Sequence, residues 1–427
     1  MAILKKLGKY ELLKKLGEGA SSTVYLGRDP FAQRQVAIKV ATPEALSNPK
    51  TGKLYTHLFL NEASLVGKLR HPHITQIYDA VVSEKLCYIV MEYVAGGTLE
   101  EHATLGHLLA VDRVIELIFK CTRALAFAHR IGLTHRDIKP ANLLLTADSE
   151  IKISDFGAAI NNQNDRTQVS AIGSPAYMSP EQILELPLDQ RTDIYSLGVV
   201  MFQLLTGRLP FEASNQFNMI NQIMHDDAPK PSALRPKLPP MLDAIVGKAM
   251  CKDRDARYQT WEAFARDLAE AVRNHQRLAP SAEFADTEKF DTLRALPFFT
   301  KFSDVEIWET LRFSQWQHVA PGTVIMHDGE AGDFFCFLAA GQLQVSKAGK
   351  ALSILTQGEC FGEMAAINPQ NPLRSADVAA LGPVDIITVR GEALQQASEG
   401  CRMRFYESFL KVMASRLISA NQREISF

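Results

Sequence analysis

The chain of 427 residues has no long hydrophobic run and no marked excess of charge of either sign. Its best apolar segment, residues 197–205, ends at Thr206 and Gly207 and falls far short of the about 18 residues that a membrane-spanning helix requires. Lysine and arginine number 46 and aspartate and glutamate 48, a net charge of −2 that argues against strong attraction to nucleic acid or anionic lipid. We therefore expect neither a nucleic acid nor a membrane among the partners.

Cysteine is scarce and scattered, and the absence of any Cys-x-x-Cys pair excludes a zinc ribbon or a disulfide scaffold. The amino terminus does not resemble a secretion signal, because Lys5 and Lys6 are followed by no apolar segment, and Ala2 excludes N-myristoylation. These absences predict buried free thiols and a cytoplasmic location. The six cysteines are Cys87, Cys121, Cys251, Cys336, Cys360 and Cys401.

Length and residue pattern predict more than one domain. Division of 427 residues by a prior of about 150 per domain gives roughly 2.8. Residues 10–92 largely alternate apolar and polar as strands do, with one helical stretch at 58–69, whereas residues 111–273 mostly show helical spacing. Together they predict one domain over residues 10–273, with a small β-rich lobe followed by a larger helical lobe.

A second domain is predicted beyond a linker at residues 274–292, which contains Pro280 and several charges but no strong apolar face. Within residues 293–427, short strand-like runs alternate with glycines, which is typical of a compact barrel or roll. Residues 394–422 then show helical spacing. This terminal helix could pair with itself in a homodimer or pack back on its own domain, and the sequence leaves both open.

The first motif that indicates chemistry is Gly-Glu-Gly-Ala-Ser-Ser-Thr-Val at residues 17–24, between two strand-like runs. Glycines let backbone amides approach phosphate oxygens, because no Cβ blocks the way. Ser22 stands where a third glycine often lies. A glycine-rich hairpin turn would look the same, so this motif alone indicates little.

The second motif is Val-Ala-Ile-Lys at residues 36–39. Strand alternation places Lys39 on the same face as Ala37. If that face points inward, the lysine needs an anionic partner, and Glu62 on the following helix is the natural candidate. Alternatively, Lys39 could extend its amine to solvent.

The third and fourth motifs are His-Arg-Asp-Ile-Lys-Pro-Ala-Asn at residues 135–142 and Asp-Phe-Gly at 155–157. The four motifs, in this order, match the signature set of protein kinases. The chain thus resembles the eukaryotic-like serine/threonine protein kinases, in particular the bacterial ones, over residues 10–273. The resemblance implies an α+β, two-lobed fold. It also makes Arg257 the buried partner of Glu181, at the end of Met-Ser-Pro-Glu.

The resemblance implies specific roles in phosphoryl transfer. Lys39, oriented by Glu62, would hold the α- and β-phosphates of ATP. Asp155 and Asn142 would ligate Mg²⁺, or Mn²⁺ in its place, through oxygen. Asp137 would accept the proton of a serine or threonine hydroxyl on a protein substrate. Lys139 would contact the γ-phosphate. The ATP-binding residues that the resemblance implies are Gly17, Glu18, Gly19, Ser22, Val24, Ala37, Lys39, Met91, Glu92, Val94, Asn142 and Asp155.

The resemblance also implies a regulatory segment over residues 155–181. Arg136 is placed where such kinases pair an arginine with a phosphate on this segment. Thr167 and Ser170 are the candidates for autophosphorylation, and polar loop residues without that role are the alternative. Ser174 is expected to help receive the substrate.

A second constellation follows in the carboxy-terminal domain. The chain reads Phe-Gly-Glu-Met-Ala-Ala at residues 361–366, and Arg374 follows about a dozen residues later. A short helix that begins after Gly362 offers backbone amides to an anion, and Arg374 can clamp a phosphate at the same place. Glu363 can accept hydrogen bonds from ribose hydroxyls. A plain salt bridge between Glu363 and Arg374 is the alternative.

This pattern resembles the phosphate-binding cassette of cyclic nucleotide-binding domains. The resemblance assigns the ribose 2′-hydroxyl to Glu363 and the cyclic phosphate to Arg374, with further contacts from Gly362, Ala365 and Ser375. A serine after the arginine does not decide between cAMP and cGMP, and we favour cAMP. The two prolines and Leu373 that precede Arg374 depart from the usual cassette.

The sequence therefore predicts a cytoplasmic, ATP-dependent serine/threonine protein kinase that is regulated by its own cyclic nucleotide-binding domain. One alternative is a kinase whose carboxy-terminal domain is structural or binds proteins only. Another is a nucleotide-binding pseudokinase scaffold, which the intact Lys39, Asp137 and Asp155 disfavour. A cAMP-activated transcription factor would need a helix-turn-helix beyond the sensor, and we expect none because the sequence ends at Phe427.

Overall fold

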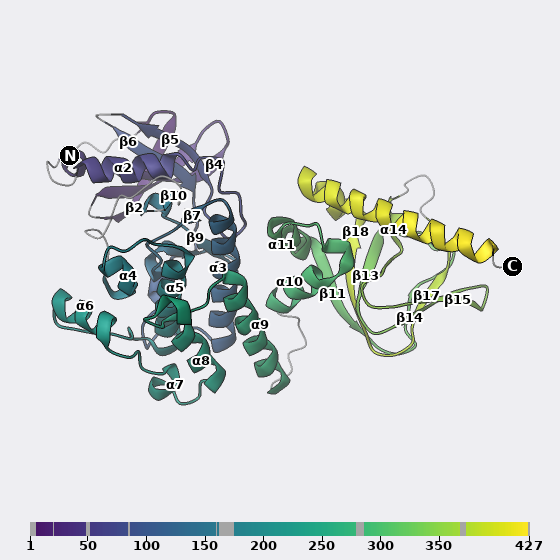
Figure 1. Cartoon of the computed structure of the whole chain (residues 1–427). Coiled ribbons are helices and arrows are strands. Elements are labelled where there is room, and N and C mark those ends of the chain that lie inside the picture. Colours follow the sequence, from purple (N-terminus) through teal and green to yellow (C-terminus); the bar gives the residue numbers. More distant parts are fainter. Residues whose placement is uncertain are drawn as a thin grey trace. The chain divides into compact units, whose positions relative to one another are not determined.

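The computed structural model describes residues 6–19, 21–47, 52–83, 86–158, 160–161, 175–278, 286–367 and 373–425. The chain forms two compact units, Met1–Pro280 and Ser281–Phe427 (Figure 1). Over the described ranges, no helix is both long and apolar enough to cross a bilayer.

The amino-terminal lobe is built on a six-stranded antiparallel sheet, in agreement with the alternating pattern. In spatial order its strands are β1 (Lys6–Leu7), β2 (Tyr10–Glu18), β3 (Ser22–Asp29), β4 (Arg34–Ala41), β6 (Cys87–Glu92) and β5 (Ile77–Val82). Val36 and Ile38 on β4 are fully buried and pack with Tyr10, Tyr88 and Val90. Because β4 lies inside the sheet, side chains on it are held firmly in place.

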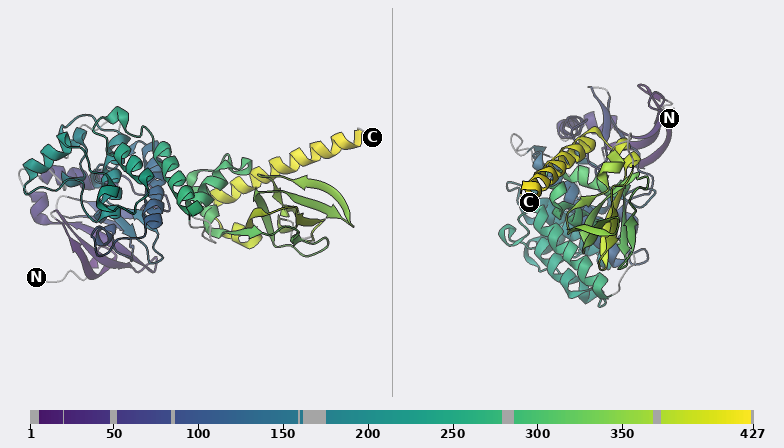
Figure 2. Two further views of the ribbon diagram at one scale, coloured as in Figure 1. Left: turned by 90° about the horizontal axis from the view of Figure 1, so that it is seen from below. Right: turned by 90° about the vertical axis from the view of Figure 1, so that its right-hand side faces the viewer.

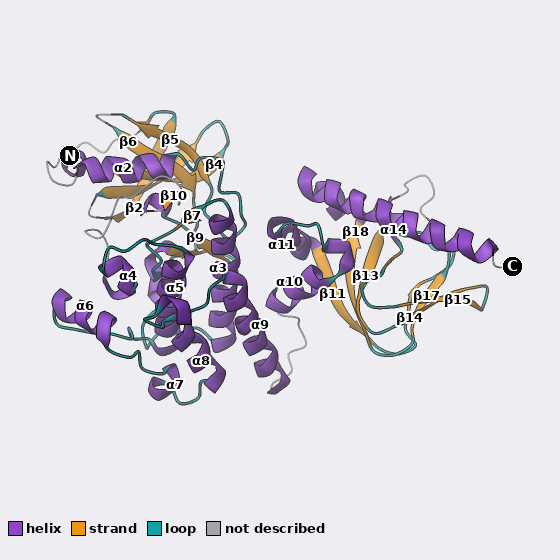
Figure 3. Cartoon of the chain, in the orientation of Figure 1, coloured by secondary structure: helices purple, strands orange, loops and turns teal. Residues whose placement is uncertain are grey.

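The helix predicted at residues 58–69 is displaced toward the amino terminus. Helix α2 spans Gly52–Ala63, after the short α1 (Pro43–Ser47), and runs beside the sheet (Figure 3). The chain leaves the helix in a turn that contains Gly67, whose φ of +73° is a left-handed conformation incompatible with helix. The apolar pattern continues past Ala63 because Leu65 and Leu69 are buried from that turn.

The second lobe of this unit is mainly helical. Helix α5 is buried on nearly every face, which explains the apolar segment at residues 197–205 as a core helix. Asp189 caps its amino terminus and Gly207, with φ +72°, ends it. The helices are α3 (Val111–Arg130), α4 (Pro180–Ile183), α5 (Gln190–Thr206), α6 (Gln216–His225), α7 (Pro231–Leu234), α8 (Pro240–Ala249) and α9 (Trp261–Leu278).

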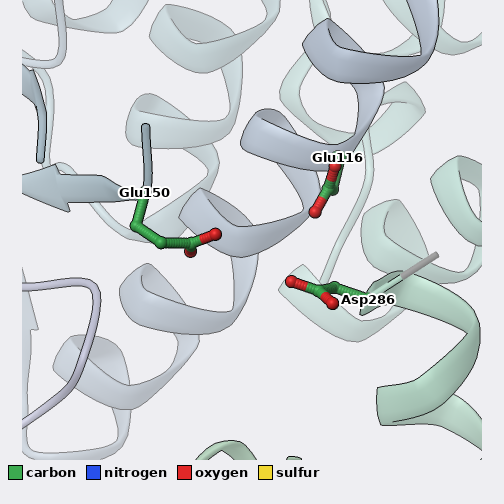
Figure 4. Close-up of side chains that lie close together, drawn as sticks. All are labelled: Glu116, Glu150 and Asp286. Carbon is green, nitrogen blue, oxygen red and sulfur yellow. The ribbon is translucent and has the colours of Figure 1, made fainter. Parts of the chain in front are cut away.

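Two short strand pairs lie in the same lobe and carry the loops that matter for function. They are β8 (Leu143–Leu145) with β9 (Ile151–Ile153), and β7 (Leu133–Thr134) with β10 (Ile160–Asn161). A fully buried lysine, Lys120 of α3, ties the helix to the β8–β9 pair. Its amine contacts Glu116 at 2.9 Å and Glu150 at 2.8 Å. Figure 4 shows these two carboxylates; Asp286, also drawn there, belongs to the other unit.

The carboxy-terminal unit is a roll of two four-stranded antiparallel sheets with flanking helices. One sheet has the order β11 (Ser314–Val319), β18 (Val384–Arg390), β13 (Phe334–Ala340), β16 (Cys360–Phe361). The other has the order β12 (Val324–Met326), β17 (Asp377–Ala380), β14 (Leu343–Lys347), β15 (Lys350–Leu355). The helices are α10 (Asp286–Ala295), α11 (Asp304–Phe313), α12 (Glu363–Ile367), α13 (Gly391–Gln396) and α14 (Glu399–Ile425).

Phenylalanine rings attach the long terminal helix to the roll. Phe405 and Phe409 of α14 meet Phe298 with ring centroids 5.6 and 5.0 Å apart, and Phe409 lies 5.1 Å from Phe335 of β13. These rings are largely or fully buried, so the amino-terminal part of α14 is fixed by apolar burial. From there α14 runs along the outside of the roll (Figure 2).

Helices flank the predicted linker on both sides. Helix α9 continues to Leu278 and α10 begins at Asp286, so helical residues occupy both ends of the stretch 274–292. The buried positions of α10 are Thr287, Phe290 and Leu293, too few to form a strong apolar face. The domain limits 10–273 and 293–427 stay a prediction.

Candidate active site and effector site

The loop that carries Asp137 is held by a buried carboxylate on α5. The backbone N–H groups of His135 and Arg136 both donate to Asp193, each at 2.7 Å. Arg136 has φ +68°, an uncommon conformation for a residue with a side chain. Burial raises the pKa of Asp193, while the two backbone N–H donors and the nearby His135 and Arg136 favour its charged form. Asp193 thus stabilises a strained loop.

Three of the predicted site residues meet at this loop. The amine of Lys139 donates to both oxygens of Asp137, at 2.8 and 3.1 Å. The side-chain amide of Asn142 donates to the backbone carbonyl of Asp137 at 2.7 Å and to its carboxylate at 3.0 Å. Asp137 is therefore an acceptor in a fixed orientation, beside a positive charge.

Asp155 is brought to the same place by the β8–β9 pair. It comes two residues after the end of β9 and has φ +68°, the second left-handed residue in the site. The N–H of the preceding Ser154 donates to the Asn142 carbonyl at 2.9 Å, which fixes the two motifs to each other. The next residue, Phe156, is buried against the His135 ring at 4.5 Å.

Lys39 bridges the two lobes of this unit. Its amine donates to Glu62 on α2 at 3.0 Å and also pairs with Asp155. Burial alone would lower the pKa of Lys39, but the carboxylates of Asp155 and Glu62 outweigh it and raise that pKa. Burial raises the pKa of Glu62, whereas the charge of Lys39 outweighs the partial desolvation of Asp155 and lowers the pKa of that carboxyl. The inward-facing prediction for Lys39 is confirmed, and its side chain is only 14% exposed.

The sheet register aligns the other residues predicted to contact ATP. Val24 lies opposite Lys39 across β3 and β4, and Ala37 lies opposite Met91 across β4 and β6. The glycine motif forms the turn between β2 and β3, where the Gly19 N–H donates to the Ser22 carbonyl at 2.8 Å. Glu92 ends β6, and Val94 comes two residues later. Gly17, Glu18 and Gly19 are exposed, as a flap over a ligand would be.

The predicted buried pair of Glu181 and Arg257 is present. Arg257 donates to the two carboxylate oxygens of Glu181 at 2.6 and 2.8 Å, and both side chains are almost fully buried. Thr192 donates to Glu181 at 2.9 Å as well. The pair joins α4 to the segment before α9, and it lies outside the phosphoryl-transfer residues.

Thr167, Ser170 and Ser174 fall outside the described residues, and so does the proposed pairing of Arg136 with a phosphate.

In the carboxy-terminal unit, the five residues predicted to bind a cyclic nucleotide line one pocket. Its volume is about 500 Å³, within the usual range for small-molecule sites. Sheet strands, α12 and the terminal helix all contribute to its wall. The five residues are Gly362, Glu363, Ala365, Arg374 and Ser375.

Arg374 is positioned by backbone carbonyls and by two glycines. Its guanidinium donates to the carbonyls of Gly362 and Phe334, each at 2.7 Å. A Cβ on Gly332 or on Gly362 would overlap the guanidinium, and Gly362 also has φ +77°. Burial lowers the pKa of Arg374 from its ordinary value. The alternative of a plain salt bridge to Glu363 is absent from the ion pairs of the described residues, and Glu363 has a different partner.

That partner is Arg416 of α14, which the sequence analysis missed. Arg416 donates to Glu363 at 2.5 Å and also to the Cys360 carbonyl. Glu363 is almost fully buried, while the Arg416 side chain is 42% exposed. Ser415 and Arg416 both line the pocket. One arginine in a polar stretch of helix gives no sequence signal, because the contact depends on how α14 crosses the roll.

Comparison with known proteins assigns both units to families. The protein kinase domain model matches residues 10–269, and the cyclic nucleotide-binding domain model matches residues 316–400. These matches confirm the predicted α+β fold, with a protein kinase domain followed by a cyclic nucleotide-binding domain.

Similar curated proteins are bacterial kinases. The serine/threonine-protein kinase PknB of Mycolicibacterium smegmatis is 38% identical over 299 residues, which cover 68% of this chain and 47% of that protein. PknB of Mycobacterium tuberculosis is 38% identical over 282 residues, covering 64% and 44%. A probable serine/threonine-protein kinase of Clostridium acetobutylicum is 33% identical over 269 residues, covering 62% and 40%. The chain spans less than half the length of these relatives. It belongs to the protein kinase family, next to the bacterial serine/threonine kinases, and carries a cyclic nucleotide-binding domain as well.

Proposed function

We propose that the chain is an active, ATP-dependent serine/threonine protein kinase. The observation that carries this proposal is the bridge from Glu62 through Lys39 to Asp155, beside an Asp137 held by Lys139 and Asn142. Phosphoryl transfer needs little covalent help from the protein. It needs neutralised phosphate charge and an acceptor oxygen held in line, and these residues supply both.

The residues fit a nucleotide and a divalent cation. Asn142 uses its amide nitrogen on Asp137, which leaves its amide oxygen as a donor atom for a metal. Asp155 supplies a carboxylate that is 41% exposed. Oxygen ligands of this kind suit Mg²⁺, with Mn²⁺ as a substitute, and the cation would neutralise charge on the phosphates when bound. Lys39 would turn from Asp155 toward the α- and β-phosphates while it keeps Glu62.

The chain's own groups perform the proton and charge steps. Asp137 accepts the proton of the serine or threonine hydroxyl as that oxygen forms a bond to the γ-phosphorus. The bond from the γ-phosphorus to the oxygen that bridges it to the β-phosphate breaks, and ADP leaves with that oxygen. Lys139, 2.8 Å from Asp137, stabilises negative charge on the transferred group and orients the carboxylate of Asp137. Gly17–Gly19 and Ser22 close over the phosphates, and Val24, Ala37 and Met91 line the adenine. The backbone at Glu92 and Val94 contacts the base.

Transfer of labelled γ-phosphate from ATP to a protein acceptor tests the kinase proposal. Asp137→Asn keeps the shape of the side chain and removes its charge, and we expect a loss of labelling of at least a hundredfold. Asp148→Asn, a change on the β8–β9 turn outside the site, serves as the matched control. Equal labelling by wild type and Asp137→Asn would reject the assignment and favour the pseudokinase scaffold. Phosphopeptide mapping of the active protein tests Thr167 and Ser170.

We propose further that the second pocket binds a cyclic nucleotide and that binding regulates the kinase. Arg374 and Glu363 both line the pocket, where they would bind a cyclic phosphate and a ribose hydroxyl respectively. Ser375 leaves the base undecided, and we favour cAMP over cGMP. Regulation requires the nucleotide to bind two kinase states with different affinities.

The six free cysteines are consistent with the proposed location in the reducing cytoplasm.

Two measurements separate the parts of this proposal. Calorimetry with cAMP and with cGMP tests binding and base preference, with Arg374→Ala as the variant that should not bind. Kinase activity titrated with each nucleotide tests regulation. Binding without any change in kinase rate would leave the domain as a binding module without a regulatory effect. Absence of binding would leave it a structural or protein-binding domain.

A further inference from the structure

Gln182 of α4 uses both ends of its side-chain amide. Its Oε1 accepts from the backbone N–H of Ser179 at 3.0 Å, and the Ser179 hydroxyl accepts from the Gln182 N–H at 3.3 Å. The two bonds form a reciprocal cap at the start of the helix. The amide nitrogen donates to the backbone carbonyl of Arg136 at 3.0 Å. Helix α4 is thereby bonded to the loop that carries Asp137.

The carbonyl that Gln182 holds belongs to the peptide group that leads into Asp137. The N–H of the same peptide group donates to Nδ1 of His135 at 3.2 Å. Asp193 holds the preceding peptide group through the N–H of Arg136. Rotation of that preceding group would relieve the φ of +68° at Arg136. Rotation of the group held by Gln182 would instead change φ of Asp137 and so redirect its side chain.

Helix α4 is anchored independently of the loop. Ser179 and Glu181 are almost fully buried, and Arg257 donates to both carboxylate oxygens of Glu181. Thr192 of α5 donates to Glu181 as well. The donor nitrogen of Gln182 is therefore held by contacts to the helical lobe that do not involve the loop it restrains.

We propose that Gln182 is a positioning residue for phosphoryl transfer, which orients Asp137 through the carbonyl of Arg136. The inference rests on the proposed kinase function, in which Asp137 accepts the proton of the acceptor hydroxyl. Proton transfer requires the carboxylate within hydrogen-bond reach of that hydroxyl, so a small displacement lowers the rate steeply. Gln182 is not among the residues that we assign to ATP, so we expect it to affect turnover and not the affinity for ATP.

Gln182→Glu separates this role from the helix cap. A glutamate at this position can still accept from Ser179, since capping boxes use either Glu or Gln, but its carboxylate cannot donate to the Arg136 carbonyl. We expect kcat for transfer of labelled phosphate to a protein acceptor to fall about tenfold, with KM for ATP unchanged. Gln182→Met, which lacks both functions of the amide, should lose at least as much.

Gln190→Glu is the matched control. Gln190 begins α5 in the same lobe, and its amide nitrogen donates to the backbone carbonyl of Gln259 at 2.8 Å, outside the groups assigned to phosphoryl transfer. The same change from amide to carboxylate should leave kcat unaltered there. A wild-type kcat in Gln182→Glu would overturn the proposal even if Gln182→Met is impaired, because Gln182 would then act only as a helix cap. A loss that Gln190→Glu shares would overturn it too.

Backbone hydrogen exchange tests the contact without any phosphate transfer. In Gln182→Glu we expect faster exchange in a peptide that covers residues 133–142, with exchange in α3 and α9 unchanged. Exchange at the wild-type rate over 133–142 would contradict the inference, and so would faster exchange throughout the lobe, which indicates general destabilisation. A wild type that transfers no phosphate would reject the kinase proposal, whereas the exchange result still confirms or rejects the hold of Gln182 on the loop.

Discussion

Arg416 and Glu363 form an ion pair of 2.5 Å between the terminal helix and the pocket wall. Glu363 is the acceptor that we assign to the ribose, and it is almost fully buried. Its carboxylate is thus satisfied by the protein before any ligand arrives, which avoids the cost of an unpaired buried charge. A ribose hydroxyl must share Glu363 with Arg416 or displace it. The position of α14 and the occupancy of the pocket are therefore linked.

The first prediction concerns this competition. Arg416→Gln shortens the side chain and removes its charge, so Glu363 loses its partner and the ribose meets no competitor. We expect the affinity for the preferred cyclic nucleotide to rise by about threefold to tenfold, in line with roughly 1 kcal/mol for a partly exposed charged hydrogen bond. Calorimetry measures it.

Arg404→Gln is the matched control for that experiment. Arg404 is on the same helix and pairs with Glu407 at 3.0 Å and Glu306 at 3.8 Å, away from the pocket. Its loss should leave nucleotide affinity unchanged. If Arg416→Gln instead weakens binding, the arginine contacts the nucleotide and does not compete with it.

The second prediction concerns the space around Arg374. Gly332→Ala would place a methyl group on the Arg374 guanidinium, so the arginine must move from its two carbonyl acceptors. We expect nucleotide affinity to fall at least tenfold, with the kinase rate in the absence of nucleotide unchanged. Gly382→Ala is the control, because a Cβ there would meet nothing within 4 Å. Equal affinities in both variants would show that Arg374 can shift without loss.

The third prediction concerns Asp193, which touches no reacting atom. Asp193→Asn replaces one of two acceptor oxygens with an N–H₂ group that cannot accept from the backbone of His135 or Arg136. The left-handed conformation of Arg136 then loses support, at a cost of about 1–3 kcal/mol. We expect kcat to fall by tenfold or more while nucleotide binding to the other domain is unchanged. Full activity in Asp193→Asn would mean that the loop keeps its geometry without this acceptor.

The residues that take part in phosphoryl transfer could be predicted from the sequence better than the residues that hold the two sites in place. Asp137, Lys139 and Asn142 lie within six positions, so backbone geometry alone brings them together. Asp155 comes after β9, which pairs with the preceding strand β8, and β8 begins directly after Asn142. Lys39 and Glu62 were paired on the argument that an inward lysine needs an anion. The contact of Arg416 with Glu363 depends on the path of α14 over the roll, and no local sequence pattern specifies that path. Helix α2 ends at Ala63, before the predicted residue 69, because the chain forms a turn with Gly67 in the left-handed conformation although the apolar periodicity continues.

The fourth prediction concerns pH and the buried pair of Glu181 and Arg257. Burial opposes the charge on Glu181, but the hydrogen bonds and charge of Arg257 outweigh it and hold the pKa of Glu181 below its ordinary value of 4.5. A carboxyl with a lowered pKa in the folded state stabilises the fold above its unfolded pKa, and that stability is lost as pH falls through the folded pKa. The pair should thus contribute fully at pH 7 and lose its contribution below about pH 4.5.

Glu181→Gln leaves Arg257 buried without its partner, and we expect it to lower the free energy of unfolding of the kinase domain by about 3 kcal/mol at pH 7. The difference between wild type and variant should shrink as pH falls below about 4.5, since wild-type Glu181 then takes up a proton. Urea unfolding at several pH values measures both effects. Glu185→Gln is the control, because Glu185 follows α4 outside the buried pair. A difference that stays constant down to pH 3 would mean that Glu181 stabilises this lobe by its shape and hydrogen bonds and not by its charge.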